Sequence, residues 1–407
     1  MSKPSILVTH PWMGRGGSEA TAVWTLQALQ DDYKVTFATA SLMDWDELNE
    51  AYGSSVDPGK IQLIRARRLP TVDNARKLVA AQLRWFERFC HRIAGRFDLC
   101  VSSYNPVDFG RPGIQLIGDF SFSEEMRKRL YIHGESRFCH QETFLRRAYL
   151  WGSALVGIRK RPLRDRRDLT LANSQWCVGQ LEENFGIPGA PVIYPPVILP
   201  QAPTDAVRDP LGFACLGRVV PEKEIERMIA ILEAVRERGF PVTLRLIGSL
   251  DDSEYSRKIG GLITEKDWIV PEGFLTLKKK QEVLASMTYA IHGCRIEAFG
   301  IAVAEMASMG CVPFVPDTGG AGEIVPFPEL QFATEEDAVE KIVAVLDYPD
   351  KAAEFRSRLA GEMDRFGPDV FMRELREHVL RFSGDRTVAG ASPASDASPS
   401  KNLAAIG

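Results

Sequence analysis

Cysteine is scarce in this chain of 407 residues, and it is poorly placed for cross-linking or metal binding. The seven cysteines are odd in number, widely scattered and never spaced as CxxC, so we expect reduced thiols and no zinc site. The longest uncharged apolar stretch, Tyr149 to Ile158, is well short of the ~20 residues that a membrane helix needs. The first residues contain no apolar signal segment with a cleavage site. These absences favour a cytoplasmic protein.

Signature motifs of several other protein classes are missing as well. The chain has no G-x-S-x-G, no H-E-x-x-H and no Walker A lysine motif. No helix-turn-helix, RNA-binding or zinc-finger signature accompanies its basic residues, so we expect no nucleic-acid partner. Asp44-Trp45-Asp46 has the D-x-D form that can bind a metal, but its place after a strand predicts that Asp44 caps a helix instead. We therefore expect no bound metal.

The composition and length of the chain indicate a globular protein of two domains. Hydrophobic residues make up 45% of the sequence and charged residues 26%, which is typical of soluble globular proteins. The length corresponds to about two domains at roughly 100–200 residues each. Strand-like and helix-like patterns alternate, which predicts parallel sheets flanked by helices. In the first half we expect a helix at Glu19–Gln30 and strands at 6–8, 34–40, 98–101, 114–117, 130–133 and 169–172.

A second alternating series follows a proline-rich stretch. The prolines at 195, 196, 200, 203 and 210 indicate an interdomain linker, because proline at that density ends regular structure. Beyond it we expect strands at 213–217, 242–247, 289–291 and 312–315, and helices at 222–238, 278–287, 299–309, 335–346, 351–365 and 369–382. The predicted organisation is therefore two doubly wound α/β domains at 1–198 and 211–366, a linker at 199–210, a C-terminal helix at 367–382 and a disordered tail at 383–407.

The net charge of −4 conceals an uneven distribution. Between Ile61 and Arg167, 22 Lys and Arg stand against 10 Asp and Glu, a net of +12, so the remainder carries 28 against 44, a net of −16. This asymmetry indicates either an anionic partner for the basic part or a solvated face balanced by the acids elsewhere. We expect an anionic membrane surface as the partner, because aromatic residues are interleaved with the charges: Trp85, Phe86, Phe89, Tyr149 and Trp151.

The most informative run of the sequence is EAFGIAVAEMASMG, which starts at Glu297 after a predicted strand. Glu297 would stand outside the carboxyl end of that strand, where open α/β sheets bind ligands. Phe299, Gly300 and Ile301 would open the next helix, and their N–H groups could bind a diphosphate. Glu305 lies roughly 7–8 Å further along the helix axis, within reach of the ribose of a nucleotide bound there. The spacing of the two acids alone could be incidental on an amphipathic helix.

A second run, GRVVPEK, starts at Gly217, directly after the first predicted strand of the second domain. Its Arg218 and Lys223 place two cations near one turn. Two fixed cations can neutralise a leaving diphosphate without a metal. Basic residues are mildly disfavoured at the start of a helix by the helix dipole, which favours a functional role over a solvent-facing one.

Two glycine-rich turns complete the pattern. Gly16 and Gly17 lie between the first strand and the first helix, where glycine permits a tight turn and a close backbone approach to a ligand. This turn could signal a Rossmann nucleotide site, but it lacks the G-x-G-x-x-G spacing. Gly319 and Gly320 follow the strand expected at 312–315.

Together these regions, in this order, resemble the retaining glycosyltransferases of family 4, which have the GT-B fold of two Rossmann-like domains facing across a cleft. The resemblance covers about residues 5 to 330. The run from Glu297 resembles the family's E-x7-E signature and departs from it mainly at Ala298, where glycine or proline is usual; Glu224 likewise replaces a usual glycine after Lys223. The resemblance implies a catalytic set of Glu297, His133, Arg218 and Lys223. It implies a donor-binding set of Gly16, Gly17, Arg218, Lys223, Phe299, Gly300, Ile301, Glu305, Gly319 and Gly320.

The resemblance also implies a role for each part of the site. In the family the first glutamate lies by the transferred sugar, the second binds the ribose, and the two cations take the diphosphate. His133 matches a family histidine near the donor sugar and the acceptor, although a lone histidine is often a satisfied structural residue. The C-terminal helix would cross back to pack on the first domain.

The implied activity is transfer of a sugar from a UDP- or GDP-sugar to an acceptor, with retention and without a cofactor. The segments 171–174 and 193–196 also resemble family elements, and their closest likeness is to mannosyltransferases that act on lipid-linked glycans. We therefore expect a lipid-linked or cell-surface polysaccharide precursor as acceptor. Two alternatives share the fold: a GT-B sugar-nucleotide epimerase or phosphorylase, and a non-catalytic scaffold that binds a nucleotide sugar or another protein. A phosphorylase would normally need a pyridoxal lysine and far greater length.

Overall fold

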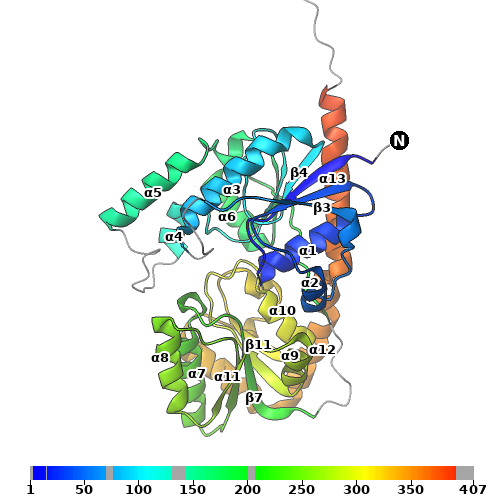
Figure 1. Cartoon of the computed structure of the whole chain (residues 1–407). Coiled ribbons are helices and arrows are strands. Elements are labelled where there is room, and N and C mark those ends of the chain that lie inside the picture. Colours follow the sequence, from blue (N-terminus) through cyan, green and yellow to red (C-terminus); the bar gives the residue numbers. More distant parts are fainter. Residues whose placement is uncertain (1–2, 15, 70–76, 131–142, 200–206, 391–407) are drawn as a thin grey trace, which may run out of the picture.

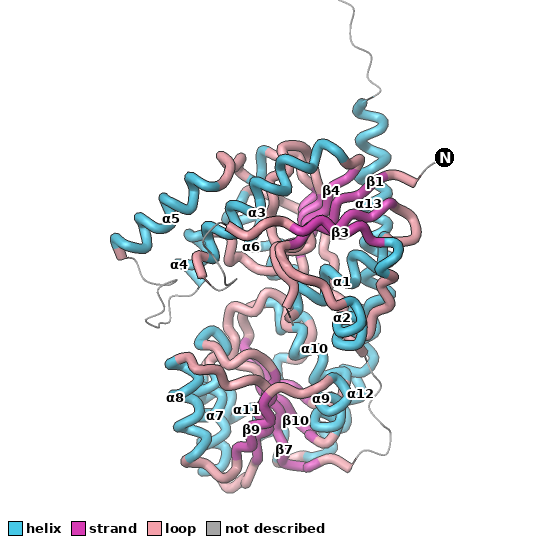
Figure 2. The backbone as a smooth tube through the Cα atoms, viewed as in Figure 1, coloured by secondary structure: helices cyan, strands magenta, loops and turns pink. Residues whose placement is uncertain are grey.

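The structure, a computed structural model that describes residues 3–14, 16–69, 77–130, 143–199 and 207–390, contains two parallel six-stranded sheets (Figure 1). The strand order is β3-β2-β1-β4-β5-β6 in the first sheet and β12-β11-β10-β7-β8-β9 in the second. Figure 2 shows the strands of each sheet inside a layer of helices. The predicted fold class, two doubly wound α/β units, is confirmed.

The N-terminal unit comprises the first sheet and its helices. Its strands are β1 (Ser5–Thr9), β2 (Lys34–Thr39), β3 (Ile61–Arg65), β4 (Leu99–Ser102), β5 (Ile114–Ile117) and β6 (Leu169–Ala172). Its helices are α1 (Gly17–Leu29), α2 (Trp45–Tyr52), α3 (Val79–Ile93), α4 (Glu124–Leu130), α5 (Phe144–Val156) and α6 (Gln175–Phe185). Successive side chains of a strand point to opposite faces, so Ile6 and Val8 pack with α1 while Leu7 packs with Phe86 of α3. Both faces of this sheet are therefore covered.

The C-terminal unit repeats the same plan with the second sheet. Its strands are β7 (Asp209–Leu216), β8 (Thr243–Ile247), β9 (Ile269–Gly273), β10 (Met287–Ile291), β11 (Val312–Pro316) and β12 (Gln331–Phe332). Its helices are α7 (Ile225–Glu237), α8 (Glu254–Thr264), α9 (Leu277–Ala285), α10 (Ile301–Ser308), α11 (Glu335–Leu346) and α12 (Pro349–Met363). Phe213, Phe314 and Phe332 are fully buried in its core.

The last helix, α13 (Pro368–Gly390), returns to the N-terminal unit and contacts α1 (Figure 1). Its Phe371 and Leu375 are buried in the same hydrophobic cluster as the strand residue Ile6. The Arg376 Nε donates to the carbonyl oxygen of Ala28 at 2.7 Å. The helix runs to Gly390, into the segment that the sequence predicts to be a disordered tail.

Two helices of the C-terminal unit begin later than the sequence predicts. The helix expected from residue 222 begins at Ile225, because Pro221–Lys223 forms a 3-10 turn and Glu224 has a left-handed backbone with φ of 50°. The helix expected from residue 299 begins at Ile301, after Gly300 with φ of 107°. In both cases a residue with positive φ stops the helix from extending towards its N-terminus.

Other differences lie in the N-terminal unit and the linker. The strand expected at 130–133 is wrong at Leu130, which ends α4; the rest of it lies outside the described residues. Strand β7 starts at Asp209, inside the linker expected at 199–210. The sequence pattern did not predict β3, whose side chains are largely exposed at the edge of the sheet. It also did not predict β9, β12, α3, α4, α5, α6 or α8.

Two local predictions can be checked directly. Asp44 caps α2, because its Oδ1 accepts a hydrogen bond from the backbone N–H of Glu47 at 3.0 Å. Six of the seven cysteines lie among the described residues, and these six are free thiols and buried. Cys139 lies outside the described residues.

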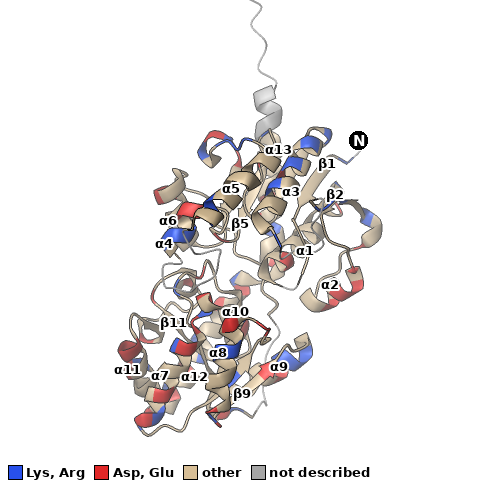
Figure 3. Ribbon diagram, turned by 60° about the vertical axis from the view of Figure 1, so that its left-hand side comes forward, with Lys and Arg blue, Asp and Glu red and all other residues tan. Residues whose placement is uncertain are grey.

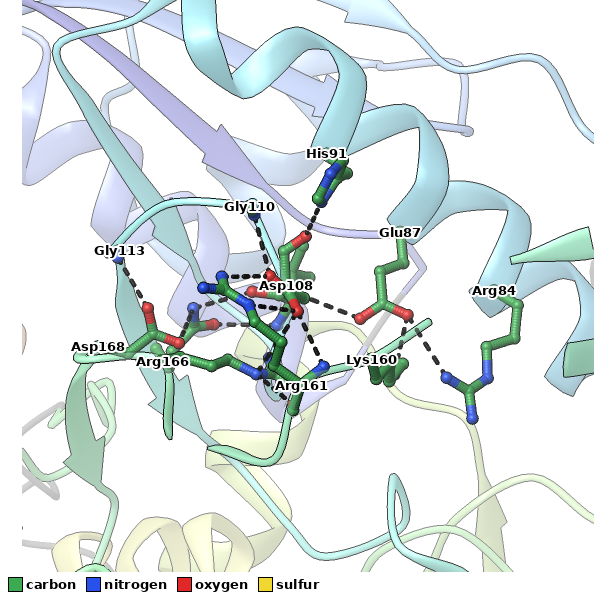
Figure 4. Close-up of polar contacts among 12 residues, drawn as sticks. Arg84, Glu87, His91, Asp108, Gly110, Gly113, Lys160, Arg161, Arg166 and Asp168 are labelled. Atoms are coloured by element: carbon green, nitrogen blue, oxygen red, sulfur yellow. Dashed lines mark hydrogen bonds and ion pairs between the residues drawn. The ribbon is translucent and has the colours of Figure 1, made fainter. Parts of the chain in front are cut away.

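A buried ionic network ties the segment after α5 to the first sheet (Figure 4). Asp108, which is 1% exposed, accepts hydrogen bonds from the backbone N–H of Gly110 at 2.9 Å and from the Arg161 guanidinium at 2.8 Å. The Arg166 Nε lies 3.9 Å from the same carboxylate. Glu87, 3% exposed, forms an ion pair with Lys160 at 2.9 Å. Three residues of the predicted basic region, Lys160, Arg161 and Arg166, therefore pair with buried carboxylates.

The two aspartates of this network have pKa values shifted in opposite directions. Burial alone would raise the pKa of Asp108, but the hydrogen bonds from Arg161 and Gly110 and the charge of Arg166 hold it well below its ordinary value. Burial raises the pKa of Asp168 to about 6, although its carboxylate accepts hydrogen bonds from the N–H of Gly113 and from Gln115. Folding therefore favours the ionised form of Asp108, whereas it disfavours the ionised form of Asp168.

Candidate active site

Glu297 stands in the loop between β10 and α10, beyond the carboxyl end of a central strand of the second sheet. Its carboxylate forms an ion pair with the ammonium group of Lys223. The Nε2 atom of His292 lies 3.1 Å from the same oxygen, and His292 is 3% exposed. The structure therefore brings together two residues that the sequence places in the site, Glu297 and Lys223, and adds a third, His292.

The charge state of this pair follows from its surroundings. Burial alone would raise the pKa of Glu297, but the Lys223 charge and the adjacent His292 ring hold it well below its ordinary value. Burial would lower the pKa of Lys223, yet the facing carboxylate raises it above its ordinary value. Burial lowers the pKa of His292. At neutral pH the centre therefore consists of a carboxylate, an ammonium and a neutral imidazole.

Arg218 is an exposed cation beside the Lys223–Glu297 pair in the sequence of the site. It follows β7, its side chain is exposed, and it makes no hydrogen bond or ion pair within the described part of the chain. Its charge nevertheless acts on Lys223 in its own unit and on Tyr104 of the N-terminal unit, whose pKa values it lowers slightly against larger effects. Because β7 neighbours β10 in the parallel sheet, Arg218 lies at the same edge of the second sheet as the Glu297 loop.

Glu224 occupies the position where the resemblance leads one to expect glycine, and the structure shows how the chain accommodates it. The residue adopts the left-handed backbone with φ of 50°, which costs a non-glycine residue roughly 1–2 kcal/mol. Its carboxylate is held by the Nε of Arg295 at 2.9 Å and by the guanidinium of Arg227 at 3.7 Å. A Cβ on Gly293 would come within 2.8 Å of the Lys223 carbonyl oxygen, so a glycine across the turn provides the close approach.

The start of α10 offers backbone donors beside the Glu297 loop. The helix has Gly300 as its N-cap, and its first backbone hydrogen bonds are those donated by Val303 and Ala304 to the Gly300 carbonyl. The N–H groups of Ile301 and of its neighbour therefore lie ahead of the helical ladder, where an anion can accept from them. Phe299 is 2% exposed, so its ring packs in the core while its backbone belongs to the turn.

Glu305 lies one helical turn further along α10 and forms an ion pair that the sequence did not predict. The Nζ of Lys280, on α9, lies 2.7 Å from its Oε1 atom. Both side chains are about one-fifth exposed, at 20% and 19%. The carboxylate keeps a second oxygen for a ligand, and the lysine fixes its orientation.

The glycine turn of the N-terminal unit touches α10 directly. Gly16 caps α1, and the Tyr52 hydroxyl bridges the turn by accepting from the Gly16 N–H at 2.9 Å and donating to the Gly14 carbonyl at 3.2 Å. A Cβ on Gly17 would lie 2.6 Å from the Cδ1 of Ile301. Glycine at 17 therefore lets the two units meet at the start of α10.

The second glycine turn packs on the backbone of the Glu297 loop. The Gly320 N–H donates to the Glu297 carbonyl at 2.7 Å, and a Cβ at Gly320 would collide with the carbonyl oxygen of Ala298. Gly319 has φ of 81° and equally little room. These two glycines hold the loop in place, and any contact that they make with a sugar would come through their backbone.

The N-terminal unit grips the same loop through the start of α6; we call this contact the α6 clamp, formed by Ser174, Ala298 and Glu323. The Ser174 Oγ donates to the Ala298 carbonyl at 2.5 Å and accepts from the Cys177 N–H at 3.0 Å. The Ala298 side chain is 7% exposed and packs in a hydrophobic cluster of the N-terminal unit. The Glu323 carboxylate accepts from the N–H groups of Gln175 and Trp176 at 3.0 and 2.9 Å. The departure from the family pattern at Ala298 thus supplies a methyl group that joins the two units.

Two histidines complete the account of the site. His133 lies outside the described residues, so its role stays a prediction. His10 follows β1 at the carboxyl end of the first sheet, is 1% exposed, and has no hydrogen-bond partner for either ring nitrogen within the described residues. Its ring lies 5.3 Å from that of Tyr104. The sequence signal for it was its position directly after the first strand.

One group of side chains has metal-binding atoms close together. One ligand atom each from His292, Cys294 and Glu297 lie within 4.8 Å of one another. The Lys223 ammonium already occupies the Glu297 carboxylate, and burial raises the pKa of the Cys294 thiol to about 12, whereas a metal ligand must be a thiolate. These residues therefore fit an internal ion pair better than a metal centre.

With this geometry established, comparison with known proteins identifies the architecture. Residues 211–348 match the family model described as Glycosyl transferases group 1. The chain superposes on Anabaena Alr3699/HepE in complex with UDP and glucose, with a TM-score of 0.65, 17% identity and coverage of 93% of this chain and 99% of that one. The chain has the GT-B fold.

Other GT-B structures match over similar lengths. The sucrose-phosphate synthase of Thermosynechococcus elongatus gives a TM-score of 0.71 at 15% identity, covering 96% of this chain and 100% of that one. WaaG, a glycosyltransferase involved in lipopolysaccharide biosynthesis, gives 0.60 at 14% identity, covering 91% and 99%. No match was found among the curated proteins. In GT-B terms, the residues described above belong to the facing edges of the two units.

Proposed function

We propose that this protein is a retaining glycosyltransferase that transfers a hexose from a nucleotide-diphosphate sugar to a glycan. The observation that carries the proposal is the arrangement at the carboxyl edge of the second sheet. There the exposed Arg218, the Lys223–Glu297 ion pair and the start of α10 follow the ends of two neighbouring strands, β7 and β10. Cations and helix N–H groups stabilise the negative charge that grows on a departing diphosphate. The family match of residues 211–348 supports the same reading.

The proposed roles follow the chemistry of each group. Arg218 and Lys223 neutralise the leaving diphosphate, with the N–H groups at Phe299, Gly300 and Ile301. Glu305 binds the ribose hydroxyls, and Glu297 lies beside the transferred sugar. The two glycine turns, at Gly16 and Gly17 and at Gly319 and Gly320, line the donor from either side. His133 stays assigned to the region where donor sugar and acceptor meet.

The donor and acceptor are proposed at two levels of detail. The proposed donor is a UDP- or GDP-sugar. The structures of Alr3699/HepE were solved with UDP and with UDP-glucose, which makes UDP-glucose one donor to test. The sequence likeness to mannosyltransferases makes GDP-mannose a second. The acceptor is a lipid-linked glycan or a cell-surface polysaccharide precursor, reached from the cytoplasm. The reaction needs no cofactor and no metal.

The function is tested by incubating the purified protein with a panel of UDP- and GDP-sugars, without acceptor, and measuring nucleotide release. We expect slow release from one donor, because glycosyltransferases leak their activated sugar to water. The rate should not change with EDTA, since two cations and the helix start replace a metal. Loss of release with EDTA and its recovery with Mn²⁺ would contradict the metal-free assignment. Tight donor binding without any release or transfer would instead favour a scaffold.

Glu305→Ala is expected to weaken binding of the donor that the panel identifies. The change removes a carboxylate proposed to accept hydrogen bonds from the ribose, which is worth roughly 1.5–3 kcal/mol, or about 10- to 150-fold in Kd. Calorimetry on the wild type and the variant measures the change directly. Glu282→Ala removes a comparable, half-exposed carboxylate from α9 and should leave the Kd unchanged. Equal Kd values for wild type and Glu305→Ala would refute the ribose assignment.

A further inference from the structure

Helix α5 has its polar and apolar sides reversed. Two polar side chains face the protein: Arg146 is 6% exposed and forms an ion pair with Glu124 of α4, and Ser153 is 4% exposed and donates to the Tyr149 carbonyl at 2.7 Å. Four of its large apolar residues face outward instead. Phe144 is 82% exposed and Trp151 69%. A surface helix ordinarily shows the opposite arrangement.

The exposed apolar residues form one continuous stripe. Phe144, Ala148, Trp151 and Leu155 follow one another at intervals of four, three and four residues, which places them on one side of a helix over about 16 Å. All four are exposed. We call them the outer face of α5; Leu145, 73% exposed, adjoins it. An apolar stripe of this kind on a protein surface marks an interaction site.

The charged residues of α5 itself are all basic. Helix α5 contains two arginines and no acidic residue, and the exposed Arg147 lies beside Phe144 and Trp151 at helical spacing. The next charged residue along the chain, Arg159, is also exposed. Figure 3 brings α5 forward and shows both blue and red segments beside it, and α4 itself begins with two glutamates and ends with three basic residues. The basic residues of the Asp108 network are not counted in this surface, since they pair with Asp108 and Glu87.

We infer that the outer face of α5 docks on an anionic lipid membrane, with the helix lying in the plane of the interface. An aromatic and aliphatic stripe edged by arginine suits the boundary between headgroups and acyl chains, where apolar side chains insert and cations meet anionic lipids. With 13 residues, α5 is too short to cross a bilayer. Throughout the described ranges, moreover, no helix has the length and hydropathy of a membrane span.

This surface differs from the one that the aromatic residues of the sequence predict. Phe86 is 4% exposed and packs with Phe89 in the core. The Trp85 Nε1 donates to the Arg67 carbonyl at 3.0 Å. The Tyr149 hydroxyl accepts from the backbone N–H of residue 80 at 2.9 Å. Of the aromatic residues named from the sequence, Trp151 is the exposed one, and its new companions come from α5 itself.

The position of α5 connects membrane docking with acceptor binding in the proposed function. The helix packs on α3 and extends beside α4 on one flank of the N-terminal unit (Figure 1), the unit to which we assign the acceptor. A membrane bound there would bring a lipid-linked acceptor to that unit. The docking itself rests only on α5, whereas this consequence rests on the proposed function. A test of membrane binding without any donor therefore separates the two.

The test is flotation of the full-length protein with phosphatidylglycerol–phosphatidylcholine vesicles, compared with pure phosphatidylcholine vesicles. We expect the wild type to float with the anionic vesicles at low salt, and less so at high salt or with neutral vesicles. The double variant Phe144→Ser/Trp151→Ser should bind roughly tenfold more weakly or worse, because two large apolar side chains no longer insert. Leu42→Ser, which changes a residue that is 76% exposed elsewhere, should float like the wild type. Circular dichroism of each variant checks that it is folded.

Three results would overturn the inference. The wild type could fail to float at low salt. The double variant could float as well as the wild type, which would mean that charge alone attracts the vesicles. Sedimentation could show a dimer that the double variant abolishes, with no flotation; a second copy of the chain would then cover the outer face of α5 instead of a membrane.

Discussion

A Lys223→Ala variant is expected to turn over its donor about 10²–10³-fold more slowly than the wild type. Lys223 is held in a 3-10 turn beside Arg218, and its ammonium group is paired with Glu297. In the proposed reaction the negative charge of the leaving diphosphate grows in the transition state, so a fixed cation acts there most strongly. Removing one preorganised charge-stabilising group typically costs an enzyme a factor of this size.

The pH dependence adds a second readout to the same variant. Lys223 helps to hold the pKa of Glu297 down, so its removal should raise that pKa and move the acidic limb of the rate profile to higher pH. The control is Lys279→Ala on α9, an exposed lysine paired with Glu282, which should keep the wild-type rate and profile. A raised KM with an unchanged kcat would show that Lys223 binds the ground state only, and a wild-type rate would remove it from the mechanism.

Asp108→Asn should destabilise the N-terminal unit by about 3–5 kcal/mol. The substitution removes the buried charge that Arg161 and Arg166 face, and a buried cation left without its partner carries a cost of this order. For a unit of this size the midpoint of thermal unfolding should fall by roughly 6–20 °C. Asp165→Asn is the matched control: it lies in the same segment, but its side chain is 57% exposed and 3.8 Å from Arg164. An equal midpoint for wild type and Asp108→Asn would mean that the network contributes nothing to stability.

The same comparison has a defined pH dependence. The folded-state pKa of Asp108 lies below the ordinary value of 3.8, so its contribution is fully present above that value and is lost as the pH falls towards the folded-state pKa. The gap between wild type and Asp108→Asn should therefore stay constant from pH 7 to about 5 and shrink below about 4. Asp168 acts with the opposite sign: its pKa of about 6 makes the wild type lose stability as the pH rises from about 4 to 6. Urea unfolding at several pH values separates the two effects.

The sequence predicted those parts of the site whose signals are local. Lys223 and Glu297 lie in short runs whose spacing follows from strand ends and helix starts, and the structure places the two side chains in contact. Lys280, by contrast, reaches Glu305 from a different helix, and Ser174 reaches Ala298 from the other unit. Such pairs exist only after the chain has folded, and no local period encodes them.

The fold itself was predicted for a similar reason. Alternating apolar runs and amphipathic segments determine a parallel α/β architecture wherever both faces of a sheet are buried, as at β1 and β10. The exposed edge strand β3 gives a weaker signal. Helix α5 was not predicted, and the pattern of its apolar residues does not show whether they face the core or the solvent.

Because of the α6 clamp, the conformation of the loop that carries Glu297 depends on both units. The Ser174 hydroxyl of the N-terminal unit donates to the Ala298 carbonyl of this loop. The Ala298 methyl group is buried among side chains of the N-terminal unit. A C-terminal unit expressed alone would expose that methyl group and leave that carbonyl to water. Chimeras that exchange N-terminal units to alter acceptor choice would need to preserve Ser174 and the α6 amides that meet Glu323. Each unit has its own sheet and core, but the active-site loop of the C-terminal unit cannot be separated from the N-terminal unit without losing these contacts.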